Sequence, residues 1–175
     1  MSGSIVTIAF LDVEYKGIGA CAACVLAESW EAESPASTYI QNIRTAEPYE
    51  PGSFYRRELP CLVSVLSLLP SLPETVVVDG YVWLSSDYRP GLGAHLYDAL
   101  GRRAPVVGIA KTAFAGIESC ASVVRVLRGI SRNPLFVTAV GIKPEIAANY
   151  VRGMAGKHRI PEMMRIADHL SRSGT

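Results

Sequence analysis

The hydrophobic pattern changes its period about a quarter of the way along the 175-residue chain, and this change constrains the fold more than any other feature. Three strand-like segments come first, rich in β-branched and aromatic residues: SIVTIAFLDVEY, GACAACVLA and SPASTYIQNIR. The sequence Lys16-Gly17-Ile18-Gly19 lies between the first two and is typical of a hairpin turn. We therefore expect the chain to open with a three-strand antiparallel meander.

After the meander the apolar residues recur with helical spacing, as Leu59, Leu62, Val63 and Leu66. This spacing predicts an amphipathic helix over residues 59–69. Pro60 is expected in its first turn, where a missing N–H costs little.

Strands and helices alternate in the rest of the chain. Strands are predicted at 75–80, 105–111 and 134–142, and helices at 91–101, 144–155 and 161–172, while residues 119–130 fit either. This order predicts an α/β fold with a mixed central sheet and helices on both faces, as in ribonuclease H-like folds. The length fits one domain over residues 1–175, because domains usually run to roughly 100–200 residues.

Composition excludes several classes of protein. Apolar residues make up 49% of the chain, charged residues 19%, and the formal net charge is +1. These values exclude a disordered chain, a coiled coil and a strongly basic nucleic-acid wrapper, but allow a local basic groove. No apolar run approaches the ~18 residues of a membrane span, so no membrane partner is expected.

The four cysteines are Cys21, Cys24, Cys61 and Cys120. Only Cys21 and Cys24 are close in sequence, and residues three apart on a strand point to opposite faces, which does not suit zinc. We expect buried structural thiols and a reducing, cytoplasmic location without a signal peptide.

Two acids follow apolar strand residues. Asp12 interrupts the first strand, where an ionised carboxylate is costly unless it is paired or bound to a cation. The alternative is a partly exposed acid partnered by Lys16. Asp79 ends the run Val76-Val77-Val78, and ligands of α/β sheets gather at such strand ends. The alternative is a plain Asp-Gly turn.

Two further acids lie on predicted helices. Glu58 precedes Leu62 by four residues and so projects toward the apolar stripe, although a first-turn Glu favoured by the helix dipole is an equal alternative. Asp168 borders the apolar face of the last helix and by itself is typical of a solvated acid. Together the four acids would suit Mg²⁺ or Mn²⁺, which prefer oxygen ligands. Lys111 ends another strand and is placed to stabilise phosphate charge, or is a surface lysine.

The segment PYEPGSFYRRE, together with FLDVEY, VVVDG, GIAK and HRIPEMMRIAD, resembles the endonuclease V family from about residue 5 to about residue 170. The resemblance implies a ribonuclease H-like nuclease that needs Mg²⁺, with Mn²⁺ as a substitute. It also implies cleavage at the second phosphodiester 3′ of a deaminated base, chiefly hypoxanthine, in DNA repair. The residues that carry over as catalytic are Asp12, Glu58, Asp79, Lys111 and Asp168, and the four acids among them are the metal ligands.

The PYEPG segment resembles the family's wedge, which separates strands at the lesion. Its substrate-binding residues carry over to Tyr49, Pro48, Pro51 and Gly52, and we assign Arg57 and Gly80 to the substrate with them. The residues agree with this role, because two prolines stiffen the loop that holds the tyrosine ring out. The alternative is a plain turn with a packed tyrosine.

Two segments depart from the family pattern. Asp79-Gly80 is usually followed by Gly-x-x-His-Pro-Arg, but here residues 81–90 are YVWLSSDYRP, and His95 comes too late to replace the missing histidine. The family often has Ser-x-Gly-His near PLFV, where this chain has residues 138–142, TAVGI. Both segments lie near the family's base pocket, so we expect intact metal chemistry with weaker recognition of hypoxanthine.

The expected partner is nucleic acid, with DNA containing a deaminated base favoured, and the expected state is a monomer. Two alternatives stay open: a non-catalytic binding protein on the same scaffold, and an RNA-directed protein. Arginines could line a groove for either nucleic acid: Arg44, Arg56, Arg57, Arg89, Arg102 and Arg103.

Overall fold

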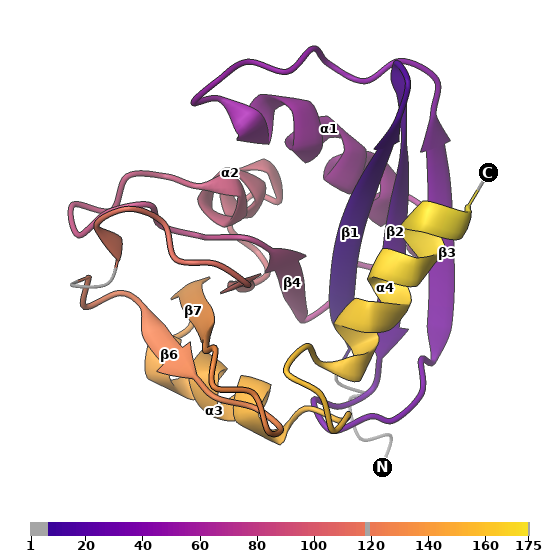
Figure 1. Cartoon of the computed structure of the whole chain (residues 1–175). Coiled ribbons are helices and arrows are strands. Elements are labelled where there is room, and N and C mark those ends of the chain that lie inside the picture. The colour runs from indigo at the N-terminus through magenta and orange to yellow at the C-terminus, as the bar shows by residue number, and fades with distance from the viewer. Residues whose placement is uncertain (1–6, 118–119, 175) are drawn as a thin grey trace.

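The computed structural model describes residues 7–117 and 120–174. In these residues seven strands form one mixed sheet of order β3-β2-β1-β4-β5-β7-β6 (Figure 1). The strands are β1 Ile8–Lys16, β2 Gly19–Ala27, β3 Ser37–Ile43, β4 Thr75–Asp79, β5 Val106–Ala110, β6 Val124–Val126 and β7 Leu135–Val140. The helices are α1 Phe54–Leu66, α2 Leu92–Ala99, α3 Pro144–Gly153 and α4 Glu162–Ser173.

The predicted meander is confirmed. Strands β1 and β2 pair antiparallel with Lys16 opposite Gly19, and β2 pairs antiparallel with β3. Gly17 takes a left-handed φ of 59° in the tight turn, which costs glycine little because it has no Cβ. The first residues of the predicted opening strand, before residue 7, lie outside the described residues.

Strand β4 pairs parallel with β1 on one side and with β5 on the other. The carboxyl ends of these three strands therefore meet at the same edge of the sheet. Strands β7 and β6 complete the sheet in antiparallel pairings, so the sheet is mixed, as predicted.

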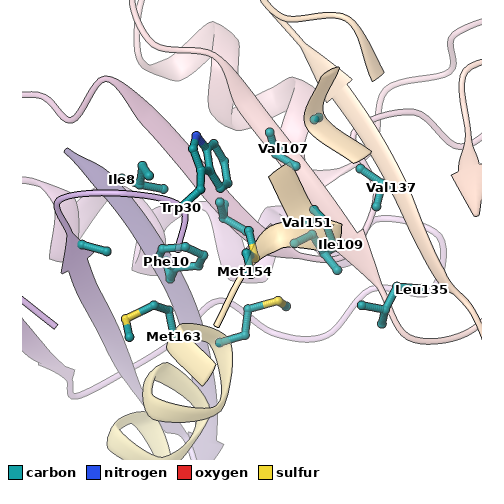
Figure 2. Packing of buried hydrophobic residues seen from close by; sticks show 14 of the residues in the cluster. Ile8, Phe10, Trp30, Val107, Ile109, Leu135, Val137, Val151, Met154 and Met163 are labelled. Carbon is teal, nitrogen blue, oxygen red and sulfur yellow. The ribbon is translucent and has the colours of Figure 1, made fainter. Parts of the chain in front are cut away.

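Helices cover both faces of the sheet, which confirms the expected layers. Alternate residues of β1 enter different cores: Ala9 and Leu11 pack toward α1 and α2, whereas Ile8 and Phe10 pack toward α3 and α4. In Figure 1 the yellow α4 lies across β1 and β2, and Figure 2 shows Phe10 and Trp30 beside Met154 and Met163. The rings of Phe10 and Trp30 meet edge to face with centroids 6.4 Å apart.

The prediction for the first helix was wrong in its bounds. α1 begins at Phe54 instead of residue 59 and ends at Leu66, so Pro60 lies in its interior. A proline there removes one intrahelical hydrogen bond to the carbonyl of Arg56. Both Pro60 and Arg56 are exposed, so water can bind this carbonyl.

The buried stripe of α1 is also shifted by one position from the predicted one. Glu58, Cys61, Leu62, Val65 and Leu66 are buried, whereas Val63 is exposed. A carboxyl group thus occupies the first position of an apolar stripe. Within residues 119–130, which the sequence left open, the structure has the short strand β6; Ser119 is outside the described residues.

Candidate acidic site at the sheet edge

Asp12 and Asp79 lie side by side on neighbouring parallel strands. The register pairs Leu11 with Val78, so the next residue of each strand is an aspartate. Because side chains alternate along a strand, both aspartates point to the same face as Phe10 and Val77, toward α4. The register of the sheet itself therefore brings the two carboxylates together.

Asp12 is held by α4. Burial raises the pKa of its carboxyl, Asp79 and Asp168 raise it further, and a hydrogen bond from Ser171 opposes this shift. The Ser171 hydroxyl donates to Asp12 Oδ2 over 2.5 Å, and its oxygen lies 2.9 Å from the Asp168 carbonyl oxygen. Lys16 is not the partner of Asp12, since its Nζ donates to the Arg172 carbonyl over 2.6 Å.

Lys111 follows β5 and reaches back to β4. Its Nζ lies 2.5 Å from Asp79 Oδ2, and both side chains are partly buried. Asp79 pairs with Ile109 in the parallel ladder, and Lys111, two residues further on, faces the same way. The lysine is thus an ion-pair partner of the acidic edge, and not a free surface side chain.

Glu58 reaches the same edge from α1, on the other side of the sheet. It is only 8% exposed, and the pKa of its carboxyl is raised to about 8 by burial and by the charges of Asp12 and Asp79. No cationic side chain of the described residues forms an ion pair with it. A buried acid beside two other acids is the environment that a bound cation would neutralise.

Asp168 joins the edge from α4. Its Oδ1 accepts a hydrogen bond from Arg172 Nε, one turn later, over 3.1 Å, and its charge contributes to the raised pKa of Asp12. Ser171 was not predicted as a site residue; it lies three residues further along the same helix face and is fully buried against Asp12. Its spacing from Asp168 was the available indication, because residues three apart on a helix are neighbours.

The charges of neighbouring acids raise the pKa values of Asp12 and Glu58, but the four acids do not form a closed metal site. Among the described residues no three His, Cys, Asp or Glu side chains lie close enough to hold an ion as they stand. Their donor chemistry still fits a divalent cation, since all offer carboxylate oxygens and Glu58 lacks a counter-charge. In this structure the Lys111 ammonium donates a hydrogen bond to one carboxylate oxygen of Asp79.

A pocket of about 590 Å³ opens beside Asp79, and we call it the Asp79 pocket. Its wall includes Gly52, Gly80, Leu84, Arg89 and Phe114 together with Asp79. A second hollow, of about 300 Å³, lies next to Lys111 and Asp168 along α4. The acidic edge therefore lies between two hollows, and the first is large enough for a small-molecule-sized group.

The PYEPG segment ends in a tight turn at the wall of this pocket. Ser53 N–H donates to the Glu50 carbonyl over 3.0 Å, which makes Pro51 and Gly52 the central residues of a β-turn. Gly52 has a φ of 77°, and a type II turn requires a positive φ at its second central position. Tyr49 is 58% exposed outside the pocket and meets Phe54, a lining residue, edge to face. Pro48 and Pro51 are exposed as well.

Of the two other residues assigned to the substrate, Gly80 lies on the pocket wall and Arg57 does not. Gly80 lines the pocket with a φ of 142°, a conformation that side chains disfavour. The Arg57 guanidinium stacks 3.8 Å over the Tyr15 ring, and its Nε is buried without a hydrogen-bond partner among the described residues. Arg57 thus lies beside the buried Glu58 and not on the pocket wall.

The segment after Gly80, which departs from the family pattern, only partly enters the pocket. Val82 is fully buried in the core, Trp83 Nε1 donates to the Ala139 carbonyl over 3.0 Å, and Leu84 alone of the three lines the pocket. His95 stacks on the Tyr55 ring with centroids 3.6 Å apart.

All four cysteines are free and buried, as expected for structural thiols. Cys24 packs in the core under α1 and α2. Cys21 Sγ lies near Gly174, directly after α4, so the two thiols are on opposite faces of the sheet. No helix in the described ranges is long and apolar enough to cross a membrane.

A mixed sheet of this order, with Asp79 at the end of β4 and Asp12 beside it in the neighbouring parallel strand β1, is typical of the class of ribonuclease H-like nucleases. The model of the family Endonuclease V matches residues 2–169 of this chain. The endonuclease V of Xanthomonas campestris is 30% identical over 98% of this chain and 79% of its own length. The endonuclease V of Streptomyces coelicolor is 32% identical over 93% of this chain and 76% of its own length. The chain belongs to the Endonuclease V family of metal-dependent nucleases.

Solved structures agree with this fold. The endonuclease V of Streptomyces avermitilis superposes with a TM-score of 0.73 at 25% identity, over 96% of this chain and 80% of that one. A second solved structure is endonuclease V of Ciona intestinalis in complex with a 24mer DNA containing an inosine followed by a ribo-adenosine. It superposes with a TM-score of 0.80 at 20% identity, over 98% of this chain and 86% of that one. The ribonuclease H-like expectation is confirmed.

Proposed function

We propose that this protein is a divalent-metal-dependent endonuclease that cuts DNA 3′ of a deaminated base, chiefly hypoxanthine, in DNA repair. One observation carries the proposal: Asp79 belongs both to the acidic edge and to the wall of the pocket. A base held in the pocket would therefore place its own phosphodiester backbone beside the carboxylates. Two Endonuclease V complexes that contain inosine support the substrate class.

Asp12 and Asp79 would hold the cation, with Glu58 and Asp168 completing its oxygen ligands. Mg²⁺ suits this set and Mn²⁺ would substitute, because both prefer oxygen donors and keep waters and phosphate oxygens as further ligands. When bound, the ion polarises the phosphodiester and lowers the pKa of a bound water. Ser171 orients Asp12 through its hydrogen bond, so that the carboxylate presents its other oxygen.

Lys111 is proposed to act on the phosphate. It pairs with Asp79 in the present state, and an ammonium at that place can stabilise charge that develops on a phosphate oxygen. Arg57, Gly52 and Gly80 are proposed to contact the strand, with Pro48 and Pro51 holding Tyr49 as the wedge. We further propose a single-domain monomer in the cytoplasm, a compartment that free buried thiols fit.

The substrate class is tested by cleavage of end-labelled strands that carry deoxyinosine, inosine, deoxyuridine or no lesion. We expect Mg²⁺-dependent cutting of the deoxyinosine strand with modest preference over the undamaged one. The reason is that Leu84 gives the pocket an apolar wall, and rejecting a wrong base needs buried polar groups. A preference of about ten-thousandfold or more would contradict this expectation, because buried polar recognition reaches that scale.

Tyr49→Ala should weaken binding to deoxyinosine strands by roughly 1–3 kcal/mol, the value of one base–aromatic stack. The exposed ring has no core role, so folding should be unchanged. Binding isotherms with labelled strands measure the loss, and Tyr49→Phe is the matched control because it keeps the ring. Equal weakening in both variants would show that the hydroxyl, and not stacking, matters.

A further inference from the structure

The wall of the Asp79 pocket contains one guanidinium, that of Arg89, to which the proposed function gives no role. Arg89 lies in the segment that departs from the family pattern. Its guanidinium carbon lies 5.7 Å from the centroid of the Phe114 ring, and Phe114 lines the same pocket. An aromatic ring face attracts a guanidinium and restricts where its plane lies.

The backbone of this segment is fixed around Arg89. Its N–H donates to Ser85 Oγ over 3.2 Å, and its carbonyl accepts from the Leu84 N–H over 2.8 Å. The following residue, Pro90, forms an isolated bridge with Trp83, which is itself bonded to the Ala139 carbonyl. The side chain of Arg89 thus projects from an ordered loop.

Two other polar side chains of the pocket wall, those of Asp79 and Tyr81, already have partners. The Asp79 carboxylate pairs with Lys111, and the Tyr81 hydroxyl donates to the Thr112 carbonyl over 2.7 Å. Arg89 forms no ion pair with any carboxylate of residues 7–117 and 120–174. Its donor groups are therefore available to a ligand in the pocket.

We propose that Arg89 is the specificity-determining residue of this pocket and donates two hydrogen bonds to O6 and N7 of a 6-oxopurine. The inference rests on the proposed function, since it assumes that the pocket takes a nucleic-acid base. The arginine fork matches two adjacent acceptors, which hypoxanthine and guanine present on this edge. Adenine presents a donor at N6 and is disfavoured.

This recognition has a built-in limit. Hypoxanthine and guanine share O6 and N7, so Arg89 separates 6-oxopurines from adenine but not the lesion from guanine. Selection against guanine is then left to the cost of taking a well-paired base out of its stack, which is smaller for a mispaired base. The role of Arg89 thus agrees with the modest lesion preference expected above.

The test compares binding of two fluorescent strands that differ by one atom of the base. One strand carries deoxyinosine and the other 7-deazadeoxyinosine, in which N7 is replaced by a C–H group. Anisotropy titrations are made without divalent metal, so that nothing is cut, with wild type, Arg89→Ala and the matched control Arg152→Ala. Arg152 is an exposed arginine of α3 that donates a hydrogen bond to Asn149.

Wild type should bind the deoxyinosine strand roughly tenfold more tightly than the 7-deazadeoxyinosine strand. This difference is the value of one hydrogen bond to a charged group. Arg89→Ala should bind both strands alike, and Arg152→Ala should keep the wild-type preference. If Arg89→Ala weakens both strands equally and keeps the preference, Arg89 contacts only phosphate and the inference is overturned. It is equally overturned if wild type shows no preference.

Adding Mg²⁺ to the same strands separates this inference from the proposed function. If Arg89→Ala loses the preference for deoxyinosine over 7-deazadeoxyinosine and wild type cuts neither strand, the role of Arg89 is supported and the nuclease function is refuted. If wild type cuts the strands but binds both equally well, the nuclease function is supported and the role of Arg89 is refuted. Thermal melting of the variants checks folding, which should be unchanged since Arg89 is exposed.

Discussion

Asp12→Asn is expected to lower cleavage of a deoxyinosine strand by roughly three orders of magnitude or more. Metal-ion catalysis supplies several kcal/mol of charge stabilisation, and each ~1.4 kcal/mol is a factor of ten in rate. The substitution removes the anionic oxygen next to Asp79 but keeps the shape of the side chain and an acceptor for the Ser171 hydroxyl. Folding should therefore be preserved. Single-turnover rates with saturating protein measure the loss.

The matched control is Asp98→Asn, the same chemical change on the exposed surface of α2, where Asp98 pairs with Arg102. It should cut at the wild-type rate. Cleavage by Asp12→Asn at a rate close to that of Asp98→Asn would mean that the acidic edge is not the active site.

Glu58→Gln is expected to stabilise the fold while it lowers activity. The pKa of Glu58 is raised from 4.5 to about 8, because the carboxyl is buried beside Asp12 and Asp79. Between these two values the unfolded chain has released the proton that the folded chain still binds, so the free energy of unfolding falls as the pH rises. The loss begins near pH 4.5 and is complete above pH 8.

Glutamine is neutral throughout, so the stability difference between Glu58→Gln and wild type should grow across this pH window. Above it we expect a gain on the order of 4–5 kcal/mol, from ~1.4 kcal/mol per pKa unit over the shift from 4.5 to about 8. Denaturant unfolding of the metal-free protein at several pH values measures it, with the exposed Glu145→Gln as control. Adding Mg²⁺ should stabilise wild type more than Glu58→Gln. A gain that does not change with pH would contradict the assigned cause.

Three candidate site residues, Asp12, Asp79 and Lys111, follow apolar strand residues in the sequence. The structure brings them to one edge, because Asp12 in β1 and Asp79 at the end of β4 lie on neighbouring parallel strands and Lys111 follows β5. Their catalytic roles stay predictions. The register that makes Asp12 and Asp79 neighbours was not predictable, because pairing between distant segments is decided by the packing of the whole sheet.

Features that depend on tertiary contacts were missed. The start of α1 was misplaced because Phe54 and Arg56 are exposed and give the first turn no buried stripe. Ser171 was missed because a serine in a helix carries no pattern of its own and gains a role only where α4 crosses β1. Residues 81–90 were expected as a whole near the base pocket, but Val82 enters the core and Leu84 lines the pocket.

We propose that the acidic edge, with a divalent cation, cuts the strand beside a base held in the Asp79 pocket. This cutting is tested by mapping the product of a 5′-labelled deoxyinosine strand incubated with the wild-type protein and either Mg²⁺ or a chelator. We expect one cut at the second phosphodiester 3′ of the lesion, with a 3′-hydroxyl end, and none with the chelator. An intact strand with both Mg²⁺ and Mn²⁺, or equal cutting in the chelator, would contradict the account.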